Sequence, residues 1–374
     1  MASERLILTV PTFFGTEATL QYEIRSLGYE PCEVTDGRVS FEGDFEAIAL
    51  SNVFLRSGQR VLIKMGEFRA TTFEELFEGV HKIAWEDFIQ KDCAFPVKGS
   101  CLKSTLSSVP ASTSIVKAAI VKRLCSKYKI EHFEETGPMM RVQFAVFNNI
   151  ATIYLDTTGE PLYKRGYRKE GVVAPMRETL AFSMIDLTRW RGDRPFLDPF
   201  CGSGTIPIEA ALYAKKIAPG IRRSFVSEKW RIMGKGLYPD AREEAISLID
   251  KDFETKIFAS DIDEKAVMLA RENAKKAGID KYIHFSVCDA TKVDIFTEKG
   301  VIVCNPPYGE RLMDRTSCES LYRRMGAHFS NYPNAGKYIL TSHEGFEKCY
   351  GREADKKRKL YNGMLKCYLY QYFK

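Results

Sequence analysis

The sequence lacks an apolar run long enough to cross a bilayer, and it lacks the paired cysteines of a zinc ribbon or redox site. No stretch approaches the ~18 consecutive apolar residues that a membrane helix requires. The ten cysteines occur singly, without a CxxC pair, which is typical of reduced, structural thiols. Residues 1–5 also lack the basic and apolar regions of a signal peptide. We therefore expect a soluble, cytoplasmic protein with no membrane partner.

Other familiar signatures are missing as well. The five histidines show none of the spacings typical of metal ligands, so we expect no metal site. No Gly-Lys-Ser/Thr triplet of the Walker type follows the glycine-rich segment, and the pattern GxGxxG is incomplete there. There is no internal repeat and no long linker. The sequence therefore argues against a metalloenzyme, a P-loop nucleotide hydrolase and a repeat protein.

Composition is ordinary, but charge is unevenly distributed. The 374 residues are 45% hydrophobic and 28% charged, with room for two or three domains. Residues 1–160 hold 17 Lys and Arg against 21 Asp and Glu, a net charge of −4. Residues 161–374 hold the remaining 38 against 28, a net charge of +10. The basic second part predicts either a polyanionic partner or a solvated lysine-rich surface, and charge alone does not choose between them.

The order of strand and helix patterns divides the chain into three parts. Residues 1–65 read as a small α+β unit, and residues 66–160 as a second mixed unit. In residues 161–374, short apolar strands alternate with helices, which is typical of a parallel, doubly wound α/β sheet. The Asn362-Gly363 step predicts an antiparallel hairpin that closes this sheet.

A glycine-rich segment at 198–205 follows an apolar strand and opens a helix. Gly202 and Gly204 allow a tight turn and a close approach of the backbone to a ligand. Free amides at the helix start suit a carboxylate or phosphate. Asp198 can bind an ammonium group, which S-adenosylmethionine has and a dinucleotide lacks. The segment predicts a binding loop for S-adenosylmethionine, and the alternative is a ligand-free turn.

Acidic residues end the next two strands. Asp261 is the first candidate for the ribose hydroxyls of the cofactor, and Asp263 is the second. The alternative role for Asp263 is to cap the following helix. Asp289 ends the third strand, where its carboxylate can accept from an adenine amine; the alternative is an exposed turn. The gap from Gly204 to Asp261 is longer than a minimal βαβ unit needs, and in this insertion, which holds 217–223 and 228–231, we expect extra helix over the active-site side.

The segment 305–309, Asn-Pro-Pro-Tyr-Gly, follows the fourth strand. An amine conjugated to an aromatic ring is a poor nucleophile. Hydrogen bonds from its N–H groups to the Asn305 side chain and the Pro306 carbonyl would orient it and favour the developing cation. Tyr308 offers a face on which a flipped base can stack. The alternative is a proline-rich turn after a buried strand.

Two segments before the glycine-rich loop are candidates for the same site. Residues 163–168 are basic and aromatic, which favours contact with a nucleic acid. The cations concerned are Lys164, Arg165 and Arg168. Glu178 and Thr179 open a helix and are candidates for the methionine end of the cofactor. The alternative for these two residues is an ordinary capped helix start.

The motifs at 198–205 and 305–309 together resemble those of the class I S-adenosylmethionine-dependent amino methyltransferases. Segments at 164–168, 174–178, 217–220 and 228–230 extend the resemblance to the THUMP-domain RNA methyltransferases, and among them to the bacterial 23S rRNA guanine-N2 methyltransferases. The resemblance covers essentially the whole chain.

That resemblance implies a fold and a set of residue roles. It implies a ferredoxin-like domain at 1–65, a THUMP RNA-binding domain at 66–160, and a Rossmann-like class I methyltransferase domain at 161–374. It implies cofactor-binding roles for Asp198, Cys201, Gly202, Gly204, Asp261 and Asp289. It implies base-binding, catalytic roles for Asn305, Pro306 and Tyr308. The THUMP region implies phosphate contacts by Lys117, Lys122, Arg123 and Lys127.

The resulting hypothesis is methylation of the exocyclic N2 amine of a guanine in 23S rRNA, free or within a ribosomal assembly particle. S-adenosylmethionine would be the donor and S-adenosylhomocysteine the product. Because the methyl donor is already activated, positioning would dominate and a strong general base would be unnecessary. The alternatives are a tRNA guanine-N2 methyltransferase, an adenine-N6 DNA methyltransferase and a non-catalytic RNA-binding assembly factor.

Overall fold

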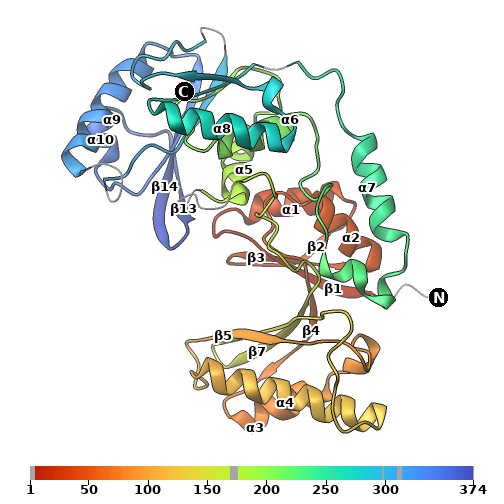
Figure 1. The fold of residues 1–374 in the computed structure, drawn as a ribbon. Helices are drawn as coiled ribbons and strands as arrows, with labels where there is room; N and C mark the ends of the chain where they lie inside the picture. The colour runs from red at the N-terminus through yellow and green to blue at the C-terminus, as the bar shows by residue number, and fades with distance from the viewer. Residues whose placement is uncertain (1–4, 169–175, 255, 297–298, 310–313, 374) are drawn as a thin grey trace.

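The computed structural model describes most of the chain, namely residues 5–168, 176–254, 256–296, 299–309 and 314–373. Within these residues the strands form two seven-stranded sheets, one N-terminal and one C-terminal (Figure 1). Both sheets carry helices, so the α/β fold class expected from the sequence is confirmed. Among the described residues, no helix has both the length and the hydropathy needed to span a membrane.

The first sheet has the strand order β2-β3-β1-β4-β7-β6-β5. Its strands are β1 (Leu6–Pro11), β2 (Pro31–Thr35), β3 (Arg38–Gly43), β4 (Leu62–Arg69), β5 (Val97–Leu102), β6 (Val142–Phe147) and β7 (Ile150–Asp156). Neighbouring strands are antiparallel except β5 and β6. One continuous sheet thus joins the two N-terminal units, and the expected boundary after residue 65 falls inside β4.

A bulge in β4 bends this sheet. The register against β7 shifts between Lys64 and Gly66, and an extra residue of this kind increases the local twist and bend. Helices α1 (Glu17–Ser26) and α2 (Phe45–Phe54) lie above the bend in Figure 1, and α3 (Phe73–Lys82) and α4 (Val109–Tyr128) lie below it. The two pairs of helices thus cover the outer face of the bent sheet, and the inner face of the bend is concave (Figure 1).

Alternation along the strands separates an apolar face from a polar one. Leu8, Ile63 and Leu155 are aligned on neighbouring strands, are buried, and share one core with all four helices. The side chains one position along point to the opposite face. Lys98 and Gln143 are paired there on β5 and β6. The concave face is consequently the polar one.

The second sheet has the order β10-β9-β8-β11-β12-β14-β13. Its strands are β8 (Phe196–Asp198), β9 (Ile257–Asp261), β10 (His284–Val287), β11 (Gly300–Cys304), β12 (Ala335–Thr341), β13 (Lys356–Asn362) and β14 (Leu365–Tyr372). The first five strands in this order are parallel, whereas β14 pairs antiparallel with β12 and β13. The doubly wound sheet and its closing hairpin at Asn362-Gly363 are confirmed.

Helices cover both faces of this second sheet. One buried core contains residues of α5 (Glu178–Leu187), α6 (Thr205–Ala214) and α8 (Glu264–Ala277), and another contains residues of α9 (Arg315–Ser330) and α10 (Phe346–Tyr350). Short 3₁₀ turns complete the described elements at Trp85–Asp87 (η1), Val226–Lys229 (η2), Arg231–Met233 (η3) and Asp280–Tyr282 (η4).

The insertion after the glycine-rich loop joins the two halves of the molecule. Its helix α7 (Leu237–Ser247) packs against α2, and its residue Tyr238 lies in the N-terminal core. The Asn52 side-chain amide of α2 donates to the Tyr238 hydroxyl at 3.0 Å. The extra helix was therefore correctly expected, but its place was not. It covers the N-terminal core because its small, buried face of Ala241 and Ala245 fits closely on α2.

Candidate active site

Parallel strands bring the sequence-predicted cofactor residues to one edge of the second sheet. Strands β10, β9, β8 and β11 are adjacent, so their carboxyl ends lie together. Asp198 ends β8, Asp261 ends β9 and Asn305 follows β11. In sheets of this type ligands bind outside the carboxyl ends of the strands. The edge is therefore the candidate site.

The glycine-rich loop turns sharply between β8 and α6. Gly202 and Gly204 have φ values of +51° and +86°, in the left-handed region that favours glycine. A Cβ on Gly204 would lie 3.0 Å from Cβ of Ala270 in α8, whereas a Cβ on Gly202 would meet nothing within 4 Å. Gly204 thus permits close helix packing, and Gly202 leaves open space. No side chain caps the start of α6, which leaves its first turn available to a ligand.

The two aspartates after β9 have separate roles. Asp261 accepts from the backbone N–H of Gly202 at 2.9 Å and from that of Asp263 at 3.0 Å. Asp263 caps α8 by accepting from the backbone N–H of Lys265 at 2.9 Å. The alternative of a helix cap is thus realised in Asp263. Asp261 fixes the glycine-rich loop and stays only half-buried, so it remains the candidate for ribose.

Buried acidic side chains near the loop have unfilled hydrogen-bonding capacity. Asp198 is 1% exposed and Glu178 is 3% exposed. Asp198 accepts from the Phe200 N–H through Oδ1, but its Oδ2 has no partner, and neither has Oε2 of Glu178 nor Oγ1 of Thr179 among the described residues. Buried acceptors without partners are costly in a folded protein. This set fits a ligand that brings an ammonium group, as S-adenosylmethionine does.

The pKa values of the same carboxyls are raised. Burial, with a contribution from the Asp261 carboxylate, raises the pKa of Asp198 well above its usual range. Burial raises the pKa of Glu178 from 4.5 to about 7, and the Arg168 guanidinium opposes that rise. Strong shifts of this kind in a concave site mark candidate functional groups. A cation bound beside these carboxyls would stabilise their charged forms.

Arg168 and Arg165 hold the site together from inside. The Arg168 guanidinium donates to Oγ1 of Thr205 at 2.7 Å, and its Nε lies 3.2 Å from Oε1 of Glu178. It thereby links the starts of α5 and α6. Arg165 is buried, donates to the Arg56 carbonyl at 2.6 Å, and lies 3.5 Å from the Glu209 carboxylate. These partners occupy both guanidinium groups inside the protein, and the RNA contacts expected of Arg165 and Arg168 stay predictions.

Asn305 and Tyr308 contact each other. The Tyr308 hydroxyl donates to Oδ1 of Asn305. Burial raises the pKa of the Tyr308 phenol well above its usual range, so the phenol is neutral and a donor. The Tyr322 hydroxyl donates to the Pro307 carbonyl at 2.5 Å and thereby fixes the turn. An incoming aromatic amine would have to replace the Tyr308 hydroxyl at Asn305.

The remaining residues predicted from the sequence, one for the target base and two for the cofactor, lie beside this site. Pro306 and Cys201 are buried, and burial raises the pKa of the Cys201 thiol, which makes it a packing group. Oδ1 of Asp289 accepts from the N–H and the hydroxyl of Thr291 at 2.8 and 2.9 Å. This is the turn that the alternative interpretation describes, and the adenine role of Asp289 stays a prediction.

One residue at the loop was missed in the sequence. Asn273 in α8 is fully buried and its side-chain amide donates to the Ser203 carbonyl at 2.9 Å. It thereby holds the glycine-rich loop from the opposite helix. The available signal was a polar residue between Ala270 and Ala274 on the apolar side of α8. Such a position is more often occupied by an apolar side chain.

The expected phosphate contacts on α4 are largely paired with other groups. Arg123 makes two hydrogen bonds to the Glu86 carboxylate, at 2.6 and 3.0 Å, and Lys127 lies 3.1 Å from the same group. The Arg123 hydrogen bonds hold the pKa of Glu86 down at about 2. Lys117 donates to the Phe95 carbonyl at 3.1 Å and pairs with Glu135. Lys122 is exposed and lies over the Phe77 ring.

No metal centre is visible in this region or elsewhere in the part of the chain that the structure describes, since no three His, Cys, Asp or Glu side chains are grouped to hold an ion. The features that remain are a glycine-rich turn, unfilled buried carboxyls and an Asn-Pro-Pro-Tyr turn on the carboxyl edge of a parallel sheet closed by an antiparallel hairpin. Fold and site together define a class I methyltransferase.

Comparison with known proteins identifies the family. Residues 165–371 match the family described as "RMKL-like, methyltransferase domain", residues 7–62 match the "RlmL ferredoxin-like domain", and residues 70–156 match the "THUMP domain". The chain belongs to this RMKL-like family of THUMP-containing methyltransferases. The resemblance seen in the sequence is thereby confirmed.

Two curated relatives span the whole chain or nearly so. The "Putative RNA methyltransferase YpsC" of Bacillus subtilis is 47% identical, over 100% of this chain and 97% of that protein. The "Ribosomal RNA large subunit methyltransferase K/L" of Psychromonas ingrahamii is 34% identical over 97% of this chain. The chain spans only 49% of the length of this second relative.

Two solved structures share the entire fold. One is named "SMU.472, a putative methyltransferase complexed with SAH"; it is 40% identical with a TM-score of 0.94, over 100% of this chain and 99% of that one. The other is named "a predicted N6-adenine-specific DNA methylase" from Listeria monocytogenes; it is 45% identical with a TM-score of 0.93, over 99% and 96% of the two chains. The family and the unfilled acidic groups agree with S-adenosylmethionine as the cofactor.

Proposed function

We propose that this protein transfers a methyl group from S-adenosylmethionine to the exocyclic N2 amine of a guanine in 23S rRNA. The observation that carries the proposal is the Asn305 to Tyr308 turn, placed beside the glycine-rich loop by the order of β8 and β11. An amide oxygen and a proline carbonyl at that point suit an amine that is conjugated to a ring. The THUMP match and the names of the two curated relatives support an RNA substrate.

The proposed chemistry asks mainly for positioning by this chain. S-adenosylmethionine supplies an activated methyl group when it is bound. Glu178 and Asp198 would hold its ammonium end, Asp261 its ribose and Asp289 its adenine. Asn305 and the Pro306 carbonyl would then accept from the guanine amine, and the Tyr308 ring would support the flipped base.

The proposal includes three domains and a location. The domains are a ferredoxin-like domain at 1–65, a THUMP domain at 66–160 and the methyltransferase domain at 161–374. The proposed location is the cytoplasm, and the ten unpaired cysteines are consistent with a reducing compartment.

Transfer of labelled methyl groups tests the substrate class. Purified protein and labelled S-adenosylmethionine are mixed separately with unmodified 23S rRNA, a large-subunit assembly particle, tRNA and duplex DNA. We expect label in 23S rRNA, free or in the particle. Label in tRNA alone would instead favour the tRNA enzyme, and label in DNA alone would overturn the RNA substrate. A protein that transfers nothing to any of them and supports ribosome assembly with Asn305→Ala would be a binding factor.

A further inference from the structure

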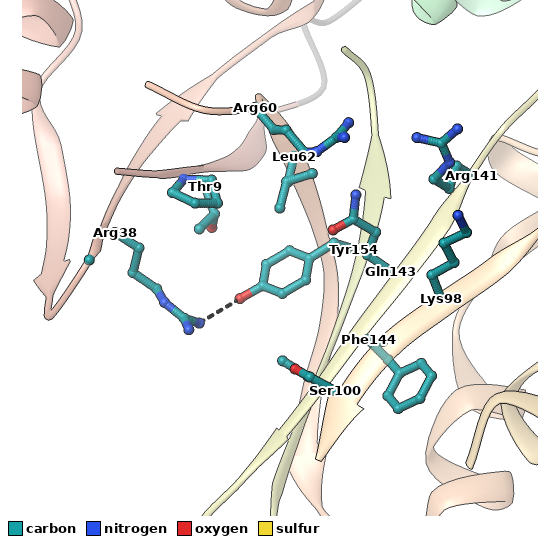
Figure 2. A pocket seen from close by; sticks show the side chains of 14 residues that line it. Thr9, Arg38, Arg60, Leu62, Lys98, Ser100, Arg141, Gln143, Phe144 and Tyr154 are labelled. Carbon is teal, nitrogen blue, oxygen red and sulfur yellow. Dashed lines mark hydrogen bonds between the residues drawn. The ribbon is translucent and has the colours of Figure 1, made fainter. Parts of the chain in front are cut away.

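A second site lies on the concave face of the first sheet, outside the methyltransferase half. A cavity of about 450 Å³ opens there, and its lining comes only from residues between 9 and 154 (Figure 2). Strands β1, β4, β5, β6 and β7 all contribute side chains to it. The bulge in β4 accounts for the hollow, because it bends the sheet around this face. A cavity of this size accommodates a nucleotide but not a duplex.

The cavity is strongly basic although the N-terminal part of the chain is net acidic. Four cations line it, and no Asp or Glu is among the described lining residues; these cations are Arg38, Arg60, Lys98 and Arg141. The Asp156 carboxylate is fully buried and lies 2.6 Å from Arg60 and 3.4 Å from Arg141. Asp156 therefore offsets part of the charge of Arg60 and Arg141, and Glu160 and Glu67 act on these arginines and on Arg38 from farther away. The cavity lining itself still contains only basic charged groups among the described residues.

Two of the cations are exposed and available to a ligand. Arg38 donates to the neutral Tyr154 hydroxyl at 3.2 Å and forms no ion pair within the described residues (Figure 2). Lys98 is exposed on β5, and within the described residues it takes part in no ion pair. On α4, by contrast, Arg123 and Lys127 share the Glu86 carboxylate. Within the described residues Arg38 and Lys98 are thus two cations of the concave face without an ion pair, whereas of the four cations expected on α4 only Lys122 has none.

Aromatic and amide groups accompany these cations. The Tyr154 ring lies in the cavity between Arg38 and Gln143 (Figure 2). Farther along the same strands Phe147 is 48% exposed, and the Lys103 ammonium lies 5.8 Å from its ring centre. Aromatic and basic side chains together on an exposed sheet suit single-stranded nucleic acid, whose bases stack while its phosphates pair with the cations.

We propose that this cavity binds a single-stranded segment of the RNA substrate, with Arg38 and Lys98 contacting its phosphates. The proposal rests on the proposed function, since it takes the substrate to be RNA. The cavity would hold a part of the RNA that is remote in sequence from the methylated base. Its role is affinity and orientation, not chemistry.

The salt dependence of RNA binding tests the assignment. Two double variants remove the same number of charges from the two competing surfaces: Arg38→Ala with Lys98→Ala in the cavity, and Lys122→Ala with Lys127→Ala on α4. All four side chains are exposed. Binding of a labelled 23S rRNA transcript is measured by fluorescence anisotropy at several salt concentrations. Calorimetry of S-adenosylmethionine binding reports whether each variant keeps its folded methyltransferase half.

Each lost contact with single-stranded phosphate lowers the slope of log K against log salt by ~0.7. The cavity variant should therefore lose about 1.4 from the slope, at ~0.7 for each of two phosphates, and the α4 variant should lose less. A cavity variant with the slope of the wild type overturns the proposal, and so does a loss confined to the α4 variant. Wild-type protein that binds no RNA at all would refute the proposed substrate as well as the cavity, whereas equal binding by wild type and cavity variant refutes the cavity alone.

Discussion

Glu178 should destabilise the folded protein while it strengthens binding of the cofactor, and Glu178→Gln should separate the two effects. The side chain is 3% exposed, and its Oε2 has no hydrogen-bond partner. Burial raises its pKa from 4.5 to about 7. The folded state therefore favours the neutral form. Glutamine keeps the shape of that form and cannot ionise.

The magnitude follows from the pKa shift. A carboxyl whose pKa is higher in the folded state contributes stability that is complete below pH 4.5 and is lost as the pH rises through about 7. At ~1.4 kcal/mol per pKa unit, ionisation at pH 8 costs about 3 kcal/mol, and at pH 5 it costs only about 1 kcal/mol. Glu178→Gln should thus stabilise the free protein at pH 8 much more than at pH 5.

The same substitution should lower the affinity for the cofactor. Loss of a charged hydrogen bond to the ammonium group costs about 1.5–3 kcal/mol, so the variant should bind S-adenosylmethionine roughly 10- to 100-fold more weakly at pH 8. In the wild type, binding should tighten as the pH rises through about 7, because the bound cation requires the ionised carboxylate.

Thermal unfolding at pH 5 and pH 8, together with calorimetry at pH 6 and pH 8, measures both effects. The reasoning predicts a gain in melting temperature that grows with pH and a loss of affinity in the same variant. A gain of the same size at both pH values would refute the pKa argument. Unchanged or tighter cofactor binding by Glu178→Gln would remove the side chain from the cofactor site.

Three further substitutions test other parts of the structure. Asp261→Ala should weaken S-adenosylmethionine binding by about tenfold or more in calorimetry. Its matched control Asp263→Ala should mainly lower the melting temperature, because it removes a helix cap worth ~1 kcal/mol. Equal affinities of the two variants for S-adenosylmethionine would contradict the separate roles of the two aspartates. Asn305→Ala should lower methyl transfer by about 100-fold with unchanged cofactor affinity, and retained activity would exclude Asn305 from base positioning. Gly220→Ala places a Cβ 2.6 Å from Cα of Val53 in α2. This close contact should destabilise the protein at the junction of its two halves by about 1–3 kcal/mol. An unchanged melting temperature would show that the junction adjusts to the added methyl group without cost.

The second sheet could be predicted from the sequence because its signals are local. Apolar strands, the glycines at 202 and 204 and the Asn362-Gly363 step each act over a few residues. Once the strands are parallel and adjacent, the positions of Asp198, Asp261 and Asn305 at one edge follow from topology.

Contacts between distant segments could not be predicted in this way. Residues 163–168 look like a surface RNA contact, yet Arg165 reaches Glu209 and Arg168 reaches Thr205, both about 40 positions away in the chain. Nothing local marks these partners. The same limit applies to α7, whose contact with α2 includes the close fit of Ala241 and Ala245 and the hydrogen bond from Asn52 to Tyr238. The net charge of residues 1–160 likewise gave no sign of the basic cavity, because its four cations come from separate stretches of a region that is acidic as a whole.

The identity of the methylated nucleoside tests the central claim most directly. RNA labelled by the protein is digested to nucleosides, and the labelled product is identified by mass spectrometry against standards. We expect N2-methylguanosine, and we expect it to be absent from the Asn305→Ala reaction. Labelled N6-methyladenosine, or a guanosine methylated on a ring nitrogen, would contradict the proposed role of the Asn-Pro-Pro-Tyr turn in holding the guanine N2 amine.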